Sequence, residues 1–327
     1  MRPSHDEVEL FGGPEAIFGC RHVAAAAPAV PSGSVAAVGA VGDRTGVTAG
    51  VVVCSSVGPD AAASYGAEAR LGRALAAAGV AVQRFHYRGT GASDGAPDEL
   101  SFPAMVDDAR AALARLRTCV RPGTVAFVGV RFGALVAARL ASSVEGAPVA
   151  LWSPVADARQ VLEAAARARA AHHPVLDVWP SDPGAMPEPD LFDLPLGAEL
   201  IDGAVVGSLP DELRGHTGEV LMVQTAAGPA ATGRARALVE RCRSQGLRVE
   251  SAAVPRHEDD GVATPSADAG PLVEHTASWL VARLTAATAA APSLAGGSTA
   301  VGPGAAGSPA LGSRVVGSVA TDGEPAP

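Results

Sequence analysis

Short apolar runs recur along the middle of the chain, and each is followed by a stretch with helical periodicity. The run Val51–Cys54 is apolar at every position, which is typical of a strand buried on both faces of a sheet. In the stretch after it, Leu71, Leu75 and Ala78 fall on one helical face, and Gly79 ends the pattern. Because strands and helices alternate, the pattern predicts a mostly parallel sheet with helices on both faces.

The same alternation continues toward the C-terminus. A strand over Val80–Phe85 precedes a helix from about Phe102 to Arg117, for which Ser101 is a candidate N-cap. The buried stripe expected for this helix consists of Val106, Ala109, Leu113 and Leu116. Further strands are predicted over Val125–Val128, Val149–Trp152, Val220–Gln224 and Val249–Val254. Further helices are predicted over Ala134–Ser142, Gly233–Gln245 and Leu272–Leu284. We therefore expect one α/β domain over residues 1–290.

Three segments depart from the alternation. The Ala/Gly-rich stretch Val23–Ala49 is expected to hold edge strands and loops. The insertion at about residues 155–217 contains a predicted helix near Arg159–Ala171 and a short one at Leu209–Leu213. It lies where a lid would cover the carboxyl edge of the sheet, and a plain surface insertion is the alternative. The tail 291–327 has too few large apolar residues to offset its ordering entropy, so we expect it to be disordered.

Composition removes several classes of function. The net charge of -9 argues against nucleic acid or an anionic membrane as the main partner. The chain contains no lysine, which excludes a Walker A lysine and a Schiff-base lysine, and we expect no cofactor. The four cysteines lack CxxC spacing and the adjacent His172 and His173 lack metal-ligand spacing, so no metal site is predicted. Without a recognisable signal peptide or membrane span, the sequence predicts a cytoplasmic protein.

The strongest motif is a strand, a tight turn and an Ala-rich helix around Gly129-Val-Arg131-Phe132-Gly133. This is the context of a nucleophile elbow, in which two glycines permit a sharp turn that presents the central side chain. Here the central residue is Arg131. A guanidinium stays protonated and has no acceptor, so it cannot attack a carbonyl or act as a general base. The motif therefore predicts the fold and argues against serine chemistry.

A literal Gly-x-Ser-x-Gly also occurs, at Gly91-Ala-Ser93-Asp-Gly95. Ser93 lies several residues beyond its strand, and the residues that follow do not begin a helix directly. The strained strand-to-helix geometry of a nucleophile is therefore missing. We interpret Ser93 as a loop residue.

The run from Phe85 to Gly95 resembles the Asp-x-Arg-Gly-x-Gly-x-Ser loop of serine-aminopeptidase-like α/β hydrolases. Cys54–Tyr65 resembles their oxyanion-loop region, and Leu151–Asp157 resembles the exit of a later strand. The resemblance extends over about residues 18–284 and is most specific to the hydrolase-like proteins associated with exosortase systems, one branch of which carries Gly-x-Arg-x-Gly at the elbow. It implies an α/β-hydrolase fold and a link to polysaccharide or surface export. His86 departs from the family, which usually has aspartate there.

The remaining triad positions are incomplete. The loop after Val220–Gln224, where the family places its acid, contains no carboxylate. His257 lies near the family's histidine position, and Asp157 lies where some members keep an alternative acid. Asp157 and His257 are thus candidates for activating a water molecule, although we favour the interpretation of Asp157 as an N-cap or an exposed carboxylate. Cys54 is either a nucleophile or, as we favour, a buried structural cysteine.

Three functions remain compatible with the sequence. In the first, Arg131, Phe132, Ser55 and Ser56 bind a carboxylate or phosphate, unless Arg131 pairs with a protein carboxylate such as Asp157 or Asp259. In the second, the protein is a hydrolase or acyl transferase acting on an ester, thioester or amide through Cys54, Ser55 or an activated water. In the third, the insertion and the tail bind a protein partner.

Overall fold

The computed structural model describes residues 4–24, 49–160, 190–191, 194–195, 200, 206–226, 233–255 and 269–290. His257, most of the predicted insertion, the edge strands expected between residues 25 and 48, and the tail 291–327 lie outside these ranges. No helix in the described part of the chain is long and apolar enough to cross a membrane.

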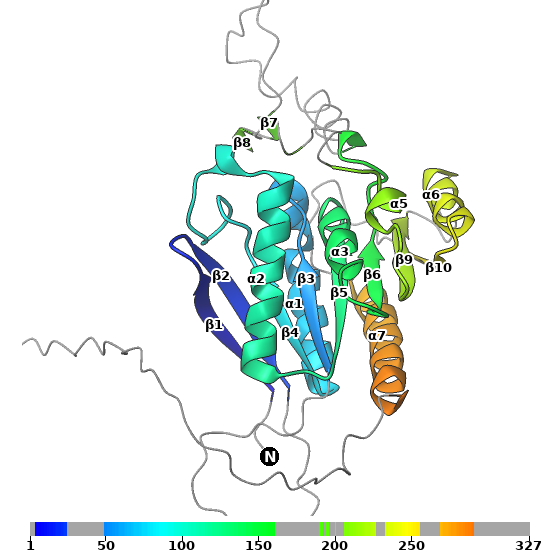
Figure 1. The fold of residues 1–327 in the computed structure, drawn as a ribbon, viewed down its shortest axis with the longest axis horizontal. Coiled ribbons are helices and arrows are strands. Elements are labelled where there is room, and N and C mark those ends of the chain that lie inside the picture. The colour runs from blue at the N-terminus through cyan, green and yellow to red at the C-terminus, as the bar shows by residue number, and fades with distance from the viewer. Residues whose placement is uncertain are drawn as a thin grey trace, which may run out of the picture. The chain divides into compact units, whose positions relative to one another are not determined.

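An eight-stranded sheet forms the centre of the molecule, in the order β1-β2-β4-β3-β5-β6-β9-β10 (Figure 1). The strands are β1 His5–Gly12, β2 Ala16–Val23, β3 Ala49–Cys54, β4 Val80–Phe85, β5 Thr124–Val130, β6 Val149–Trp152, β9 Glu219–Ala226 and β10 Arg248–Pro255. The six strands from β4 to β10 are parallel, whereas β1 and β2 form an antiparallel hairpin at one edge. The prediction of a mostly parallel sheet is confirmed.

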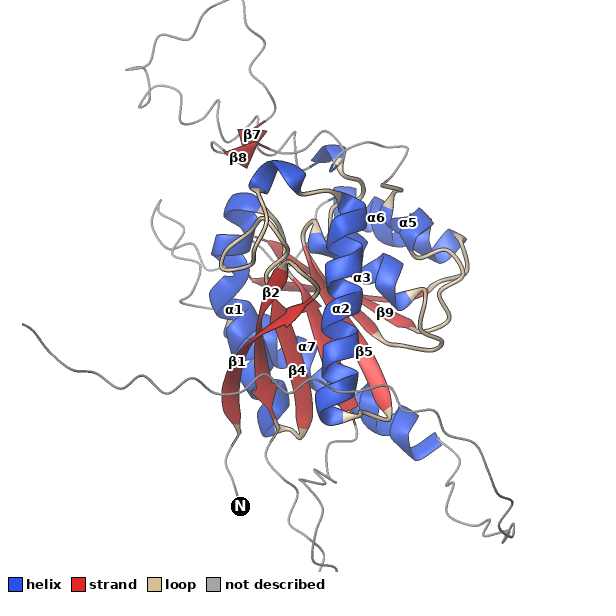
Figure 2. Ribbon diagram, turned by 60° about the vertical axis from the view of Figure 1, so that its left-hand side comes forward, coloured by secondary structure: helices blue, strands red, loops and turns tan. Residues whose placement is uncertain are grey.

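Helices cover both faces of this sheet (Figure 2). They are α1 Gly58–Ala77, α2 Phe102–Val120, α3 Gly133–Ala141, α5 Leu209–Glu212, α6 Gly233–Ser244 and α7 Gly270–Ala290, with a 3-10 turn η1 at Pro97–Glu99. Ser101 caps α2 as predicted, since its hydroxyl accepts the N–H of Ala104. A two-stranded sheet of β7 Asp190–Leu191 and β8 Leu194–Pro195 and the short α5 are the described elements of the insertion.

The alternation of side chains along β3 explains why both faces need helices. Val51 and Val53 pack into the cluster that contains α1 and α7, whereas Val52 and Cys54 pack into the cluster that contains α2 and α3. All four residues are completely buried. Each buried side chain of this size contributes about 1.5–3 kcal/mol, so the apolar run is stable only inside a three-layer structure.

The hairpin β1–β2 is not among the predicted elements. Its first strand alternates charged and apolar residues, but the usual orientation is reversed. Glu9 faces α2 and accepts hydrogen bonds from Arg115 of that helix and from Arg21 of β2, whereas Val8 and Leu10 are about two-thirds exposed. The strand is held by ion pairs on its inner face, which a hydrophobic pattern does not reveal.

Candidate functional site

The turn between β5 and α3 places Arg131 at the carboxyl edge of the sheet. Its backbone is left-handed, with φ 52°, a conformation that costs a residue with a Cβ about 1–2 kcal/mol. Arg131 N–H donates to Trp152 O (2.9 Å) and Arg131 O accepts from Ala134 N–H (3.2 Å). These two bonds fix the turn between a neighbouring strand and the first residues of the helix.

Glycine is required at both ends of this turn. A Cβ on Gly129 would lie 2.6 Å from the Cα of Ala134, and a Cβ on Gly133 would lie 2.2 Å from the carbonyl oxygens of Cys54 and Ser55. Real Cβ atoms do not approach backbone atoms so closely. The start of α3 is therefore packed directly against the backbone that leaves β3.

The Arg131 side chain forms an ion pair with Asp60, which lies in the first turn of α1. Arg131 Nε donates to Asp60 Oδ2 (3.1 Å), and Nη1 makes a long contact with Ser153 O (3.5 Å). Both side chains are about a third exposed or slightly more. The sequence left two roles for Arg131, binding an external anion or pairing with a protein carboxylate. The structure shows a pairing with a carboxylate, but its partner is Asp60 rather than Asp157.

Phe132, the next residue, is completely buried and packs edge to face on Phe102, with 6.2 Å between ring centroids. Its side chain therefore anchors α3 and is not accessible to a ligand. Its backbone N–H has no acceptor within the described ranges, and no side chain caps the N-terminus of α3. Any contribution of Phe132 to binding comes from this N–H group.

The two serines after β3 differ in their contacts. Ser55 Oγ donates to Glu68 Oε2 (2.5 Å), and Glu68 is completely buried and also accepts the hydroxyl of Ser64 (2.7 Å). Ser56 is 3% exposed, and its hydroxyl has no partner among the residues that the structure describes. Ser55 is therefore held by a carboxylate, whereas Ser56 retains an unused hydroxyl.

Cys54 is a structural cysteine. It is completely buried, and burial raises the pKa of its thiol to about 12. A nucleophilic thiol needs a lowered pKa and access to the substrate, and Cys54 has neither. Its burial and raised pKa therefore argue against Cys54 as a nucleophile.

Asp157 follows β6, and its Oδ1 accepts the backbone N–H of Gln160 (3.2 Å), which is an N-cap type of contact. This is the simpler of the two interpretations given for Asp157. His257 lies outside the described residues, so the pairing of Asp157 with His257 stays a prediction.

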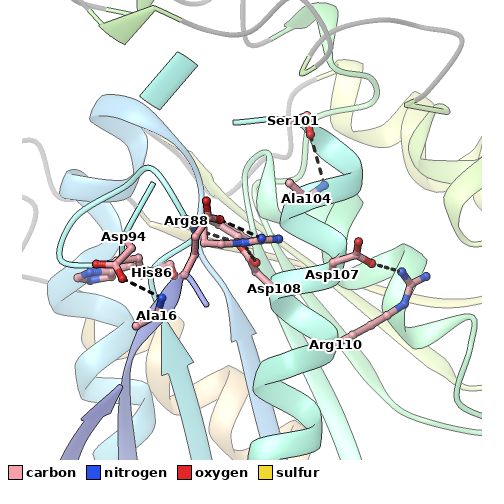
Figure 3. Close-up of polar contacts among 12 residues, drawn as sticks. Ala16, His86, Arg88, Asp94, Ser101, Ala104, Asp107, Asp108 and Arg110 are labelled. Atoms are coloured by element: carbon pink, nitrogen blue, oxygen red, sulfur yellow. Dashed lines mark hydrogen bonds and ion pairs between the residues drawn. The ribbon is translucent and has the colours of Figure 1, made fainter. Parts of the chain in front are cut away.

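Ser93 has a structural role in the loop after β4, as the sequence predicts. Its Oγ donates to His86 O (2.7 Å) and accepts the N–H of Phe18 (2.9 Å). Asp94 Oδ2 accepts the N–H of Ala16 (2.9 Å), which ties the same loop to the beginning of β2 (Figure 3). His86, which departs from the family pattern, stacks on the ring of Phe18 with 4.9 Å between centroids. The loop therefore links the beginning of β2 to the end of β4 by hydrogen bonds.

An ion pair that the sequence pattern does not indicate also joins this loop to α2. Asp108 on α2 is 1% exposed and accepts both the N–H of Arg88 (2.8 Å) and its Nε–H (2.6 Å) (Figure 3). A cavity of about 270 Å³ lies beside the pair, between the β1–β2 turn and α2. None of the residues predicted for ligand binding lines this cavity.

Comparisons with known proteins agree with this architecture. Residues 49–196 match the family model described as serine aminopeptidase, S33. A comparison with curated proteins gives no match. Among solved structures, Est1E from Butyrivibrio proteoclasticus with bound ferulic acid has a TM-score of 0.57 at 14% identity and covers 83% of this chain and 96% of its own. An esterase from Pyrococcus furiosus has a TM-score of 0.56 at 13% identity, with 86% and 91% covered.

A putative hydrolase from Agrobacterium vitis gives a TM-score of 0.53 at 16% identity and covers 86% of this chain and 100% of its own. At these identities the structural likeness concerns the fold and carries no substrate with it. The strand order and the helices on both faces are those of the α/β-hydrolase fold, and the matched region 49–196 includes the strands β3 to β6 of the same sheet. The chain therefore has the α/β-hydrolase fold, and its residues 49–196 are similar to the family described as serine aminopeptidase, S33.

Proposed function

We propose that this protein is a hydrolase-like binding protein that has lost the serine mechanism and binds an anion, a carboxylate or a phosphate, beside Arg131. The observation that carries the proposal is the position of Arg131. It occupies the left-handed residue of the strand–turn–helix, which is the equivalent of a nucleophile elbow. A guanidinium at that place binds anions and cannot act as a nucleophile.

Positive partial charges surround the same place. The helices α1 and α3 both begin there, and neither N-terminus has a side-chain cap. The contact of Gly133 with the carbonyl of Ser55 brings the two helix starts together. Unpaired N–H groups at helix N-termini and the helix dipole favour an anion.

Asp60 acts as an internal counter-ion in this proposal. It engages Arg131 through Nε, and the Nη1 contact with Ser153 O is long, at 3.5 Å. The terminal nitrogens of the guanidinium thus remain for an incoming carboxylate or phosphate, which arginine binds in a bidentate manner. The competing interpretation is that Asp60 simply occupies the anion's place, so the test must include Asp60.

The experiment is a calorimetric titration of the full chain with inorganic phosphate and, separately, with acetate. We expect binding to the parent, loss of binding in Arg131→Ala, and several-fold tighter binding in Asp60→Asn, because the internal competitor is removed. The matched control is Arg110→Ala, since Arg110 is an exposed arginine that pairs with Asp107 on α2. Absence of binding in both the parent and Asp60→Asn would contradict the proposal.

A second candidate function, an active hydrolase, is favoured by one observation. The hydroxyl of Ser55 donates to the Glu68 carboxylate at 2.5 Å, and a base within hydrogen-bond reach is what a nucleophilic serine requires. Arg84 lies 3.8 Å from the same carboxylate. A covalent adduct of a fluorophosphonate probe at Ser55, absent in Ser55→Ala, would favour this candidate over anion binding.

We place the protein in the cytoplasm, a proposal supported by its four cysteines, which are all free thiols: Cys20, Cys54, Cys119 and Cys242. The third interpretation, a scaffold for a protein partner, rests on the insertion and the tail, most of which lie outside the described residues. Fractionation of cells that express the tagged full chain tests the location.

A further inference from the structure

Three residues with metal-binding side chains meet on the β1–β2 hairpin, away from the Arg131 turn. Asp6 on β1 lies directly opposite His22 on β2, and Cys20 is two residues before His22. Residues two apart on a strand point to the same face. One potential ligand atom of each side chain lies within 4.8 Å of those of the other two.

His22 is the fixed member of this cluster. Its ring is completely buried beneath α1 at Gly72, where a Cβ would lie 2.2 Å from the imidazole. Its Nδ1 points at Asp6 Oδ1 (2.6 Å), and its Nε2 has no partner among the described residues.

Asp6 is already oriented by a second residue. Arg73 on α1 donates to Asp6 Oδ2 through Nη2 (3.2 Å) and Nε (3.3 Å), while Oδ1 faces His22. An arginine that holds one carboxylate oxygen leaves the other available as a ligand, as in the outer shell of many metal sites.

We propose that Asp6, Cys20 and His22 form a binding site for a thiophilic divalent cation such as Zn²⁺. One sulfur, one imidazole nitrogen and one carboxylate oxygen are a set that zinc accepts, whereas Mg²⁺ and Ca²⁺ require mainly oxygen ligands. Because Asp6 is exposed and Cys20 is half-buried, the fourth position faces solvent and takes water or a small ligand. The site uses no residue of the Arg131 turn.

Ion binding requires small movements and a proton balance. With metal–ligand distances of about 2.0–2.3 Å, the three ligand atoms of a tetrahedral site lie about 3.3–3.6 Å apart. Asp6 and Cys20 must therefore shift by about an ångström around the fixed imidazole. The Cys20 thiol loses its proton to solvent, and His22 binds the ion through Nδ1 as the tautomer that carries its proton on Nε2.

The test uses the full chain, freed of metal by chelation and titrated with Co²⁺, which reports thiolate ligation by a charge-transfer band in the near ultraviolet. We expect one equivalent to give this band and Cys20→Ser to abolish it. Asp6→Asn should weaken binding by at least about 100-fold, because loss of a ligand exceeds the usual effect of outer-shell changes. The matched control is Cys119→Ser, which alters the other half-buried thiol and should leave the band unchanged.

Two results would overturn the proposal. One is the absence of a thiolate band at saturating Co²⁺, and the other is a band that persists in Cys20→Ser. Circular dichroism of each variant confirms folding, and Cys20→Ser and Asp6→Asn are close in size to the parent residues. Zn²⁺ should also raise the melting temperature of the parent and not that of Cys20→Ser, since an ion that binds only the folded chain stabilises it.

Discussion

The guanidinium Nε of Arg131 lies 3.1 Å from Asp60 Oδ2, although the two residues are 71 positions apart in the chain. The pairing of β3 with β5, with Cys54 opposite Gly129, brings the start of α1 beside the turn that carries Arg131. The contact therefore depends on strand order rather than on a local motif. It links the most unusual residue of the chain to the helix that follows the first parallel strand.

We expect this ion pair to contribute little to stability. Both side chains are about a third exposed or slightly more, and exposed pairs contribute about 0.2–1 kcal/mol. A double-mutant cycle with Arg131→Ala and Asp60→Ala, measured by urea denaturation, should give a coupling energy in that range. A coupling energy well above that range would mean that the ion pair has a structural role, which would count against anion binding.

The turn itself should respond in opposite directions to two substitutions. Arg131→Gly should stabilise the fold by about 1 kcal/mol, because glycine adopts the left-handed backbone without strain. Gly133→Ala should destabilise it by about 1–3 kcal/mol or more, because its Cβ would meet two backbone carbonyls. Thermal denaturation checks both. Gly13→Ala is the control, since a Cβ there meets nothing within 4 Å.

Native-state alkylation should distinguish the cysteines. Burial raises the pKa of Cys54 to about 12 and that of Cys242 to about 11. With its pKa this far above pH 8, the Cys54 thiol stays protonated, so iodoacetamide should leave it unmodified until the protein unfolds. Peptide mass spectrometry with and without urea reads this out. Rapid native labelling of Cys54 would restore it as a candidate nucleophile.

The stability of the fold should fall as the pH falls below about 6.5. Burial lowers the pKa of His22, His86 and His216 in the folded state. Between each lowered pKa and the ordinary value near 6.5, the unfolded chain binds more protons than the folded chain, so stability increases with pH in that window. Urea denaturation at pH 5, 6 and 7 measures the slope. His216→Gln should make it shallower, and an unchanged slope would contradict the assignment.

The sequence predicts the parallel strands and their helices because a fully buried strand needs apolar residues at every position, as in the run Val51–Cys54. It also predicts the turn at Arg131, since only glycine fits at positions 129 and 133. It did not indicate the partner of Arg131. Several carboxylates were candidates, and only the order of the strands selects Asp60 among them.

The sequence does not indicate the cluster of Asp6, Cys20 and His22 for a related reason. Sequence rules for metal sites look for closely spaced ligands, whereas here one ligand comes from the opposite strand, paired with His22 across the hairpin. The hydrophobic pattern does not indicate the hairpin itself, because the ion pair of Glu9 and Arg21 lies on its inner face beside the apolar Phe11 and Ile17. A site built on an unrecognised element cannot be found from spacing alone.

The close packing of Gly133 on the carbonyls of Cys54 and Ser55 separates the shape of the turn from the chemistry of its central residue. The backbone at position 131 is imposed by its two flanking glycines and by hydrogen bonds to Trp152 and Ala134, none of which involves the guanidinium. A different side chain introduced at this position would be presented at the same edge of the sheet. The residue at position 131 can therefore be exchanged without a change in the backbone of the turn.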